Sequence, residues 1–431
     1  MSINRLHAAR AEAKARNRRL RCRTGATAGA RAGTGTKTIS TPALEKASCD
    51  TDYHDRPQPR RKKEQQPLAT PIALCQPAHA AAETTLDPIE PVTITVAKSR
   101  THIYPGHGDR ISTCATRFGI SIRLVTGQPP PVVDCLVDAL VHDSGCAIPA
   151  SIRSLLKIHY PRVARQTPDS AFTTDTQLYN WCDGTEAVWA RVQDIERRAN
   201  KCFRKHMDEH AWCDVAQLVL QLALDVAGGP DPDFVLEINN VQSQAVDVAF
   251  LPQIRKHDGG GLRHVNRRTD FAIAVDIERS SHVHADPEQL FLSPMTDAYT
   301  ATLPLMCGLE VKRLDGSEEE AQLQLMVWQA AMLAHLDYLR KTGGSPNLPL
   351  PPVVAWTVTN HSWKLYVAWK EPGGAVHVMR PFAQSTAASS AGTENAVSIF
   401  ILLKLWTTLI SWFKTDYYPA YQVLLRQARQ A

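Results

Sequence analysis

The order in which hydrophobic patterns change along the chain limits its possible folds more than any other feature. Apolar residues in Asp208–Val226 recur with helical spacing, whereas those in Asp270–Ile277 alternate as in a strand. A second strand is predicted at Leu305–Arg313, and a long helix at Glu318–Lys341 follows it directly. Helices that alternate with strands in this way favour an α/β fold with a mixed sheet.

Further elements extend this pattern on both sides. The other predicted strands are Gln244–Leu251, Pro352–Thr359, Trp363–Trp369 and Val376–Phe382, and the other predicted helices are Leu136–Val141, Ile152–Ile158, Asp183–Lys205 and Asn395–Lys414. The sequence therefore predicts an α/β core of helix, three strands, helix and strand, with an N-terminal helical extension and a C-terminal helix.

The N-terminal quarter of the chain differs in composition from the rest. Residues 1–66 contain 16 Lys/Arg and 6 Asp/Glu, whereas the remaining residues contain 32 and 37. Residues 1–105 also have few aromatics and no sustained apolar period, so they cannot bury enough apolar surface to offset chain entropy. We predict a disordered basic tail at 1–105 and one domain at 106–425, with a helical extension at 106–205 and a catalytic core at 206–425.

A dense cationic cluster lies within this tail. Arg60, Arg61, Lys62 and Lys63 are typical of a nuclear import signal or a nucleic-acid-binding patch, and a solvated charge run is the alternative. The Arg-rich first 24 residues leave a mitochondrial presequence as a second possible address. We expect an intracellular, nuclear protein.

The cysteines and the most apolar segment both exclude other classes of protein. None of the ten cysteines forms a CxxC pair, so the spacing does not support a zinc or redox protein. Ala396–Phe413 is as long as a membrane span but contains Lys404 near its middle, and a charge there is costly in a bilayer. This segment is therefore expected to be a packed helix, with no membrane partner.

Three polar residues on the two central strands are candidates for catalysis. Alternation places Asp270 on one face of its strand, and it places Glu310 and Lys312 on one face of the next. If the two faces coincide, the three side chains converge. Their small neighbours are expected to leave room for a metal and a substrate backbone; these are Ala272, Ala274 and Gly308.

Such a trio suits hydrolysis of a phosphodiester. Two carboxylates can hold Mg²⁺ or Mn²⁺, hard cations that prefer oxygen ligands, and the Val311 carbonyl can add a third. The metal neutralises the phosphate and lowers the pKa of bound water. Lys312 can orient that water or stabilise the charge that develops on the phosphorane.

Asp270 followed by Glu310-Val311-Lys312 resembles the signature of the PD-(D/E)XK nuclease superfamily, whose core is helix, three strands, helix, strand. The stretches DEHAWCDVAQLVLQLAL, RTDFAIAV, LEVKR and EEEAQLQLMVWQAAMLAHLDYL are similar to a fungal PD-(D/E)XK nuclease-like family, over roughly residues 110–425. The resemblance implies a restriction-endonuclease-like fold. It also implies that Asp270 is the strand carboxylate and that Glu310 and Lys312 form the ExK pair.

The resemblance extends to two further positions. Glu209 matches the acid that many members carry on the first core helix, where it would be a metal ligand. Gln324 and Trp328 resemble the Gln-x3-Tyr pattern of the exonuclease branch, with Trp in place of Tyr, and imply a catalytic role for Gln324. Thr269 stands where the family often has proline, and the 40-residue gap before Glu310 implies an inserted loop.

Each of these residues also has a purely structural interpretation. Glu310 and Lys312 could form an ordinary ion pair on an exposed strand, and Asp270 could simply begin its strand. Glu209 could be an acid in the first turn of a helix, and Gln324 a solvated helix residue. We therefore expect a metal-dependent nuclease acting on DNA, and keep as alternative a catalytically silent nuclease-like module that binds nucleic acid or protein. The presence of all three core residues favours the nuclease, and the net acidic body favours the silent module.

Overall fold

A computed structural model describes residues 94–97, 122–125, 129–174, 184–227, 233–255, 262–280, 291–371, 374–379 and 390–431. Every structural statement below refers to these residues. The cationic cluster Arg60–Lys63 and all but four residues of the predicted tail lie outside them.

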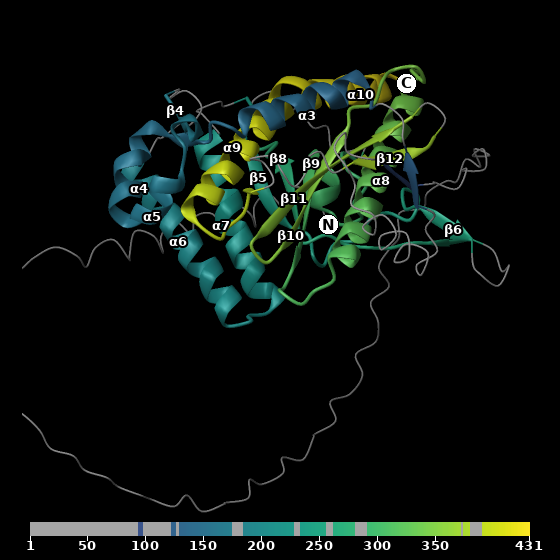
Figure 1. Cartoon of the computed structure of the whole chain (residues 1–431). Helices are drawn as coiled ribbons and strands as arrows, with labels where there is room; N and C mark the ends of the chain where they lie inside the picture. Colours follow the sequence, from purple (N-terminus) through teal and green to yellow (C-terminus); the bar gives the residue numbers. More distant parts are fainter. Residues whose placement is uncertain are drawn as a thin grey trace, which may run out of the picture. The chain divides into compact units, whose positions relative to one another are not determined.

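An eight-stranded mixed sheet forms the centre of the fold, with the strand order β2-β1-β12-β11-β10-β9-β8-β5 (Figure 1). Strand β9 pairs antiparallel with β8 and parallel with β10, and β5 closes one edge antiparallel to β8. The strands are β1 (Ile94–Ala97), β2 (Ile122–Val125), β5 (Leu236–Asn240), β8 (Phe271–Val275), β9 (Leu305–Lys312), β10 (Val353–Thr359), β11 (Ser362–Lys370) and β12 (Val376–Met379).

Helices cover both faces of this sheet (Figure 1). They are α3 (Pro131–Asp143), α4 (Arg153–His159), α5 (Pro161–Gln166), α6 (Thr185–Arg204), α7 (Glu209–Ala227), α8 (Glu318–Thr342), α9 (Ala396–Trp412) and α10 (Tyr418–Gln430), with a π-helical turn at Phe413–Tyr417 between the last two. Two short strand pairs lie outside the sheet, β3 (Ile148–Pro149) with β4 (Phe172–Thr173) and β6 (Gln253–Arg255) with β7 (Leu262–His264).

The predicted core order is confirmed, with one strand misplaced. Along the chain the core elements are α7, β5, β8, β9, α8 and β10, which is helix, three strands, helix, strand. The strand predicted at Gln244–Leu251 is wrong, because β5 lies earlier, at Leu236–Asn240. Turns occupy Gln244–Leu251 instead: the Asp247 carboxylate accepts a hydrogen bond from the Ala249 amide, and its carbonyl accepts one from Phe250.

Strand β1 is a second departure from the predictions. Ile94–Ala97 pairs in parallel with both β12 and β2, so these four residues belong to the sheet and not to the predicted tail. Their alternating β-branched residues suit a strand, but four residues are too few to stand out against the polar sequence around them.

The two faces of the sheet have different helical covers. Residues Leu309 and Trp356 lie side by side on one face, where Trp356 stacks on Trp406 of α9 at 5.3 Å between ring centroids. Gly308 and Ala355 lie on the opposite face, which α8 covers. In Figure 1, α8 lies on one side of the central strands, and α7 and α9 lie on the other.

Gly308 does not leave the space that the sequence analysis expected. A Cβ atom at this position would lie 2.8 to 3.0 Å from three ring atoms of Trp328 on α8. The glycine therefore admits the indole and not a metal or a substrate backbone. Ala272 and Ala274 are also fully buried, so the small residues serve close helix packing along most of the strand.

The C-terminal helices pack against the protein. Among the described helices, one segment is long and apolar enough to span a bilayer, Ala396–Gln430. However, 72% of its most apolar window is buried inside the protein. Leu402, Leu405 and Trp406 are completely buried, and Lys404 is 3% exposed. This packing agrees with the expectation of a core helix.

The close contact between Gly308 and Trp328 makes a testable prediction. Gly308→Ala should lower the free energy of unfolding by about 1–3 kcal/mol, because the added methyl group meets a ring that α8 holds in place. Urea denaturation measures the change. The control is Gly145→Ala, since the nearest atom to a Cβ there is 3.7 Å away.

A double-mutant cycle identifies the cause. In a Trp328→Leu background, the cost of Gly308→Ala should fall by more than the roughly 0.5 kcal/mol expected for independent sites. An unchanged cost would contradict the assignment of the strain to the indole ring.

Candidate functional site

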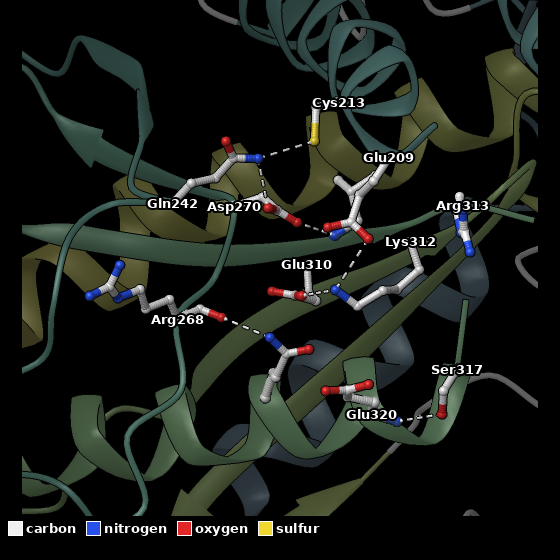
Figure 2. Close-up of polar contacts among 12 residues, drawn as sticks. Glu209, Cys213, Gln242, Arg268, Asp270, Glu310, Lys312, Arg313, Ser317 and Glu320 are labelled. Carbon is white, nitrogen blue, oxygen red and sulfur yellow. Dashed lines mark hydrogen bonds and ion pairs between the residues drawn. The ribbon is translucent and has the colours of Figure 1, made fainter. Parts of the chain in front are cut away.

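Asp270 and Glu310 face each other across two adjacent strands. Phe271 pairs with Leu309 in the antiparallel register of β8 and β9, so Asp270 lies directly opposite Glu310 and on the same face. The Asp270 amide continues the ladder with a hydrogen bond of 3.0 Å to the Leu309 carbonyl. Their side chains lie between α7 and α8 (Figure 2). The expected coincidence of the two polar faces is therefore present in the structure.

Two donors fix the carboxylate of Asp270. The Val311 amide donates to Oδ2 at 2.6 Å, and the Gln242 side chain donates through Nε2 to Oδ1 at 2.8 Å. Gln242 also lies 3.4 Å from the thiol of Cys213 on α7. These hydrogen bonds restrict the carboxylate to one orientation without using all its lone pairs.

Gln242 was missed by the sequence analysis. It lies just after β5, where its main-chain amide donates a hydrogen bond of 3.2 Å to the Asn240 side chain. No periodic pattern in the sequence marks it. Only the pairing of β5 with β8 brings this turn to Asp270. A correct prediction of the position of β5, and of its antiparallel pairing with β8, would have placed Gln242 near Asp270.

Glu310 is almost completely buried, with 2% of its surface exposed. Its Oε1 accepts a hydrogen bond of 2.6 Å from the Lys312 amine, whereas its Oε2 is buried and has no hydrogen-bond partner among the described residues. Burial, together with the charge of Asp270, raises the pKa of Glu310 to about 8. Burial also raises the pKa of Asp270, although its two hydrogen-bond donors and Lys312 oppose the shift.

Lys312 connects the strands to the first core helix. Its amine lies 2.6 Å from Glu310 and 3.5 Å from Glu209 at the start of α7. Burial lowers the pKa of Lys312, but the carboxylates of Glu310 and Glu209 outweigh it, so that the pKa is raised and the ammonium form is favoured. Lys312 is therefore a cation held between two carboxylates.

Gln324 contacts the main chain next to the carboxylate pair, and its predicted catalytic role stays a prediction. Its side-chain amide donates a long hydrogen bond of 3.4 Å to the carbonyl of Arg268, and in the described part of the chain it makes none to Asp270, Glu310 or Lys312. Its Oε1 is buried without a hydrogen-bond partner there.

The donor set fits a hard divalent cation. Asp270 and Glu310 supply carboxylate oxygens, and the unpartnered Glu310 Oε2 is a buried acceptor for which a cation would provide a partner. The described residues contain no group of three or more His, Cys, Asp or Glu able to hold a metal. Glu209 instead faces the Lys312 amine, so its predicted role as a ligand stays a prediction, as does that of the Val311 carbonyl.

Comparison with known families agrees with this geometry. A model of the PD-(D/E)XK nuclease superfamily matches residues 158–418. The chain belongs to this superfamily. No curated protein matches the sequence significantly. The matched region contains α7, the three strands of the core, α8 and the carboxylate pair, and the predicted restriction-endonuclease-like fold is confirmed.

The raised pKa of Glu310 predicts a pH-dependent stability. A carboxyl with a folded pKa of about 8 and an ordinary value of 4.5 binds more protons in the folded protein, so stability is lost as the pH rises from 4.5 to 8. Glu310→Gln removes this loss. Its free energy of unfolding relative to the wild type should increase across that interval, by up to about 1.4 kcal/mol per pH unit for one proton.

Urea denaturation of both proteins in EDTA, at pH values from 4 to 9, measures the difference. Contributions from distant titratable groups cancel in the difference between the two free energies of unfolding. Above the pKa of Glu310 in the folded protein, this difference should become constant. A difference that does not change between pH 4.5 and 8 would show that Glu310 titrates normally in the folded protein.

Proposed function

We propose that this member of the PD-(D/E)XK nuclease superfamily is a metal-dependent nuclease that hydrolyses phosphodiester bonds of DNA. One observation carries the proposal: Asp270 and Glu310 meet across β8 and β9 in a buried place, with a free Glu310 oxygen and the Lys312 amine beside them. Two buried carboxylates destabilise a fold unless a cation or a proton compensates. Their placement is therefore better explained by chemistry than by packing.

Each residue has a distinct task in this mechanism. Asp270 and Glu310 would hold Mg²⁺ or Mn²⁺, which when bound would neutralise the phosphate and lower the pKa of the attacking water. Gln242 and the Val311 amide keep the Asp270 carboxylate in place, so little reorganisation is needed. Glu209 and Glu310 orient the Lys312 ammonium, which directs the water and offsets the negative charge on the oxygens of the phosphorane.

A second candidate is the catalytically silent module that binds nucleic acid or protein. The Lys312 amine already compensates part of the charge of Glu310, and Gln324 bonds to a main-chain carbonyl outside the carboxylate pair. Both contacts would also stabilise a protein that cuts nothing. Cleavage assays separate the two candidates directly.

We further propose that the basic segment Arg60–Lys63 directs the chain to the nucleus and adds affinity for nucleic acid. Replacing its four cations by alanine should leave a tagged protein distributed through the cell. Nuclear accumulation of that variant would contradict the import role, without bearing on the nuclease proposal.

Substitution of the three central residues tests the mechanism. Asp270→Asn, Glu310→Gln and Lys312→Ala should each lower the rate of DNA cleavage by about 10²–10³ with Mg²⁺ or Mn²⁺, because each removes charge that stabilises the transition state. The losses should not add in the triple variant, since the residues act as one unit. Cleavage of plasmid and linear DNA, with EDTA as the blank, provides the measurement.

A control carboxylate separates this effect from a general change of charge. Asp225 lies near the C-terminal end of α7, where it forms a partly exposed ion pair with Arg191 of α6, so Asp225→Asn should leave the rate unchanged. Metal-dependent cleavage that survives both Glu310→Gln and Lys312→Ala would place the active site elsewhere.

A further inference from the structure

Arg268 is an exposed arginine two residues before Asp270, just ahead of β8. In the described part of the chain its guanidinium has no hydrogen-bond or ion-pair partner. Figure 2 shows Arg268 and Lys312 on opposite sides of Asp270 and Glu310, with the Arg268 guanidinium directed away from the carboxylates. It therefore does not neutralise the site, and no described residue competes with a ligand for its charge.

The main chain of Arg268 is held in place although its side chain is exposed. Its carbonyl accepts the hydrogen bond from Gln324 of α8, at 3.4 Å. The next residue, Thr269, is 3% exposed, and the Asp270 amide is bonded to β9. A cation on a fixed main chain loses less conformational freedom on binding than one on a free loop.

Two other cations on β9 and just after it, Lys312 and Arg313, are already paired with carboxylates. Lys312 contacts Glu310 and Glu209, and Arg313 lies 2.8 Å from Asp315. Because carboxylates dominate the centre, a polyanionic strand needs a positive contact close by that is not neutralised internally. Arg268 provides one, and a guanidinium matches the geometry of two phosphate oxygens.

We infer that Arg268 binds the phosphate next to the scissile one on a DNA strand, and that Gln324 positions Arg268 by holding its carbonyl. The inference rests on the proposed nuclease function for the identity of the ligand. It also gives a task to Gln324, whose side-chain amide bonds to the Arg268 carbonyl. Arg268 is in this view a binding residue, and Gln324 acts through it.

Binding of fluorescent single-stranded and duplex DNA to the full chain in EDTA tests the inference without requiring cleavage. Arg268→Ala should weaken binding about tenfold, because a hydrogen bond to a charged group is lost. The slope of log affinity against log salt should fall by about 0.7 for a single strand or 0.9 for a duplex, as expected for one phosphate contact. Arg268→Lys should retain the slope and part of the affinity, since it keeps the charge but not the fork.

Arg279 provides a matched control at the other end of β8. Its side chain is 70% exposed and lies 3.7 Å from Asp276, so Arg279→Ala removes an equal charge without touching the proposed contact. Its affinity and salt slope should equal those of the wild type. Gln324→Ala should weaken binding in the wild-type background but not in Arg268→Ala, which a purely structural role of Gln324 would not produce.

The outcomes separate this inference from the proposed function. Wild-type affinity and salt slope in Arg268→Ala would overturn the inference, even if the wild type cleaves DNA. Arg268-dependent binding by a protein that never cleaves would support a contact between Arg268 and a DNA phosphate, but would overturn both the nuclease proposal and the placement of that phosphate beside a scissile one. In a cleaving protein, a raised KM with unchanged kcat supports contact with the neighbouring phosphate, whereas a lowered kcat with unchanged KM overturns it. Absence of DNA binding by the wild type in EDTA would overturn the inference, whereas the nuclease proposal is decided by cleavage with Mg²⁺ or Mn²⁺.

Discussion

The side chain of Asp270 takes over a main-chain hydrogen bond at the end of the ladder between β8 and β9, and the geometry of the site depends on it. The Asp270 amide donates a hydrogen bond to the Leu309 carbonyl, and the Asp270 carboxylate accepts one of 2.6 Å from the Val311 amide. The same carboxylate that would hold a cation thus satisfies a buried donor of β9. Replacement by alanine would leave that donor unpaired, whereas asparagine retains an acceptor, so Asp270→Asn is the cleaner probe of chemistry.

The burial of the carboxylate pair costs stability, so stability alone does not account for its presence. Glu310 is 2% exposed, one of its oxygens has no partner in the described protein, and its pKa is raised to about 8. Lys312 supplies one positive charge for two carboxyl groups, so ionisation of both would leave one negative charge uncompensated, in agreement with the raised pKa of Glu310. Apolar residues of similar size would fill this place at lower free energy. Such local conflict with packing rules is expected at functional sites and rare elsewhere.

The parts of the fold that the sequence predicted are those with strong internal periodicity. Apolar and small or polar residues alternate clearly in β8 and β9. Ser317 caps the start of α8, where its hydroxyl accepts a hydrogen bond from the Glu320 amide, and three acids follow in the first turn. Strand β5 was misplaced because its residues are mostly half-buried at the sheet edge, so burial imposes no sharp alternation. Gln242 and the packing of Trp328 on Gly308 depend on contacts between elements distant in sequence, which no local pattern encodes.

The strand period of two accounts for the part of the site that sequence alone could place. Glu310 and Lys312 must share a face, and their contact at 2.6 Å follows from that spacing once the strand exists. The approach of Asp270 depends in addition on the register of β8 against β9, because a slip of one residue would turn its carboxylate to the face that α9 covers. The Asp270–Val311 hydrogen bond is specific to the observed register. The residue proposed to bind the metal therefore also helps to specify the strand pairing that brings it to Glu310.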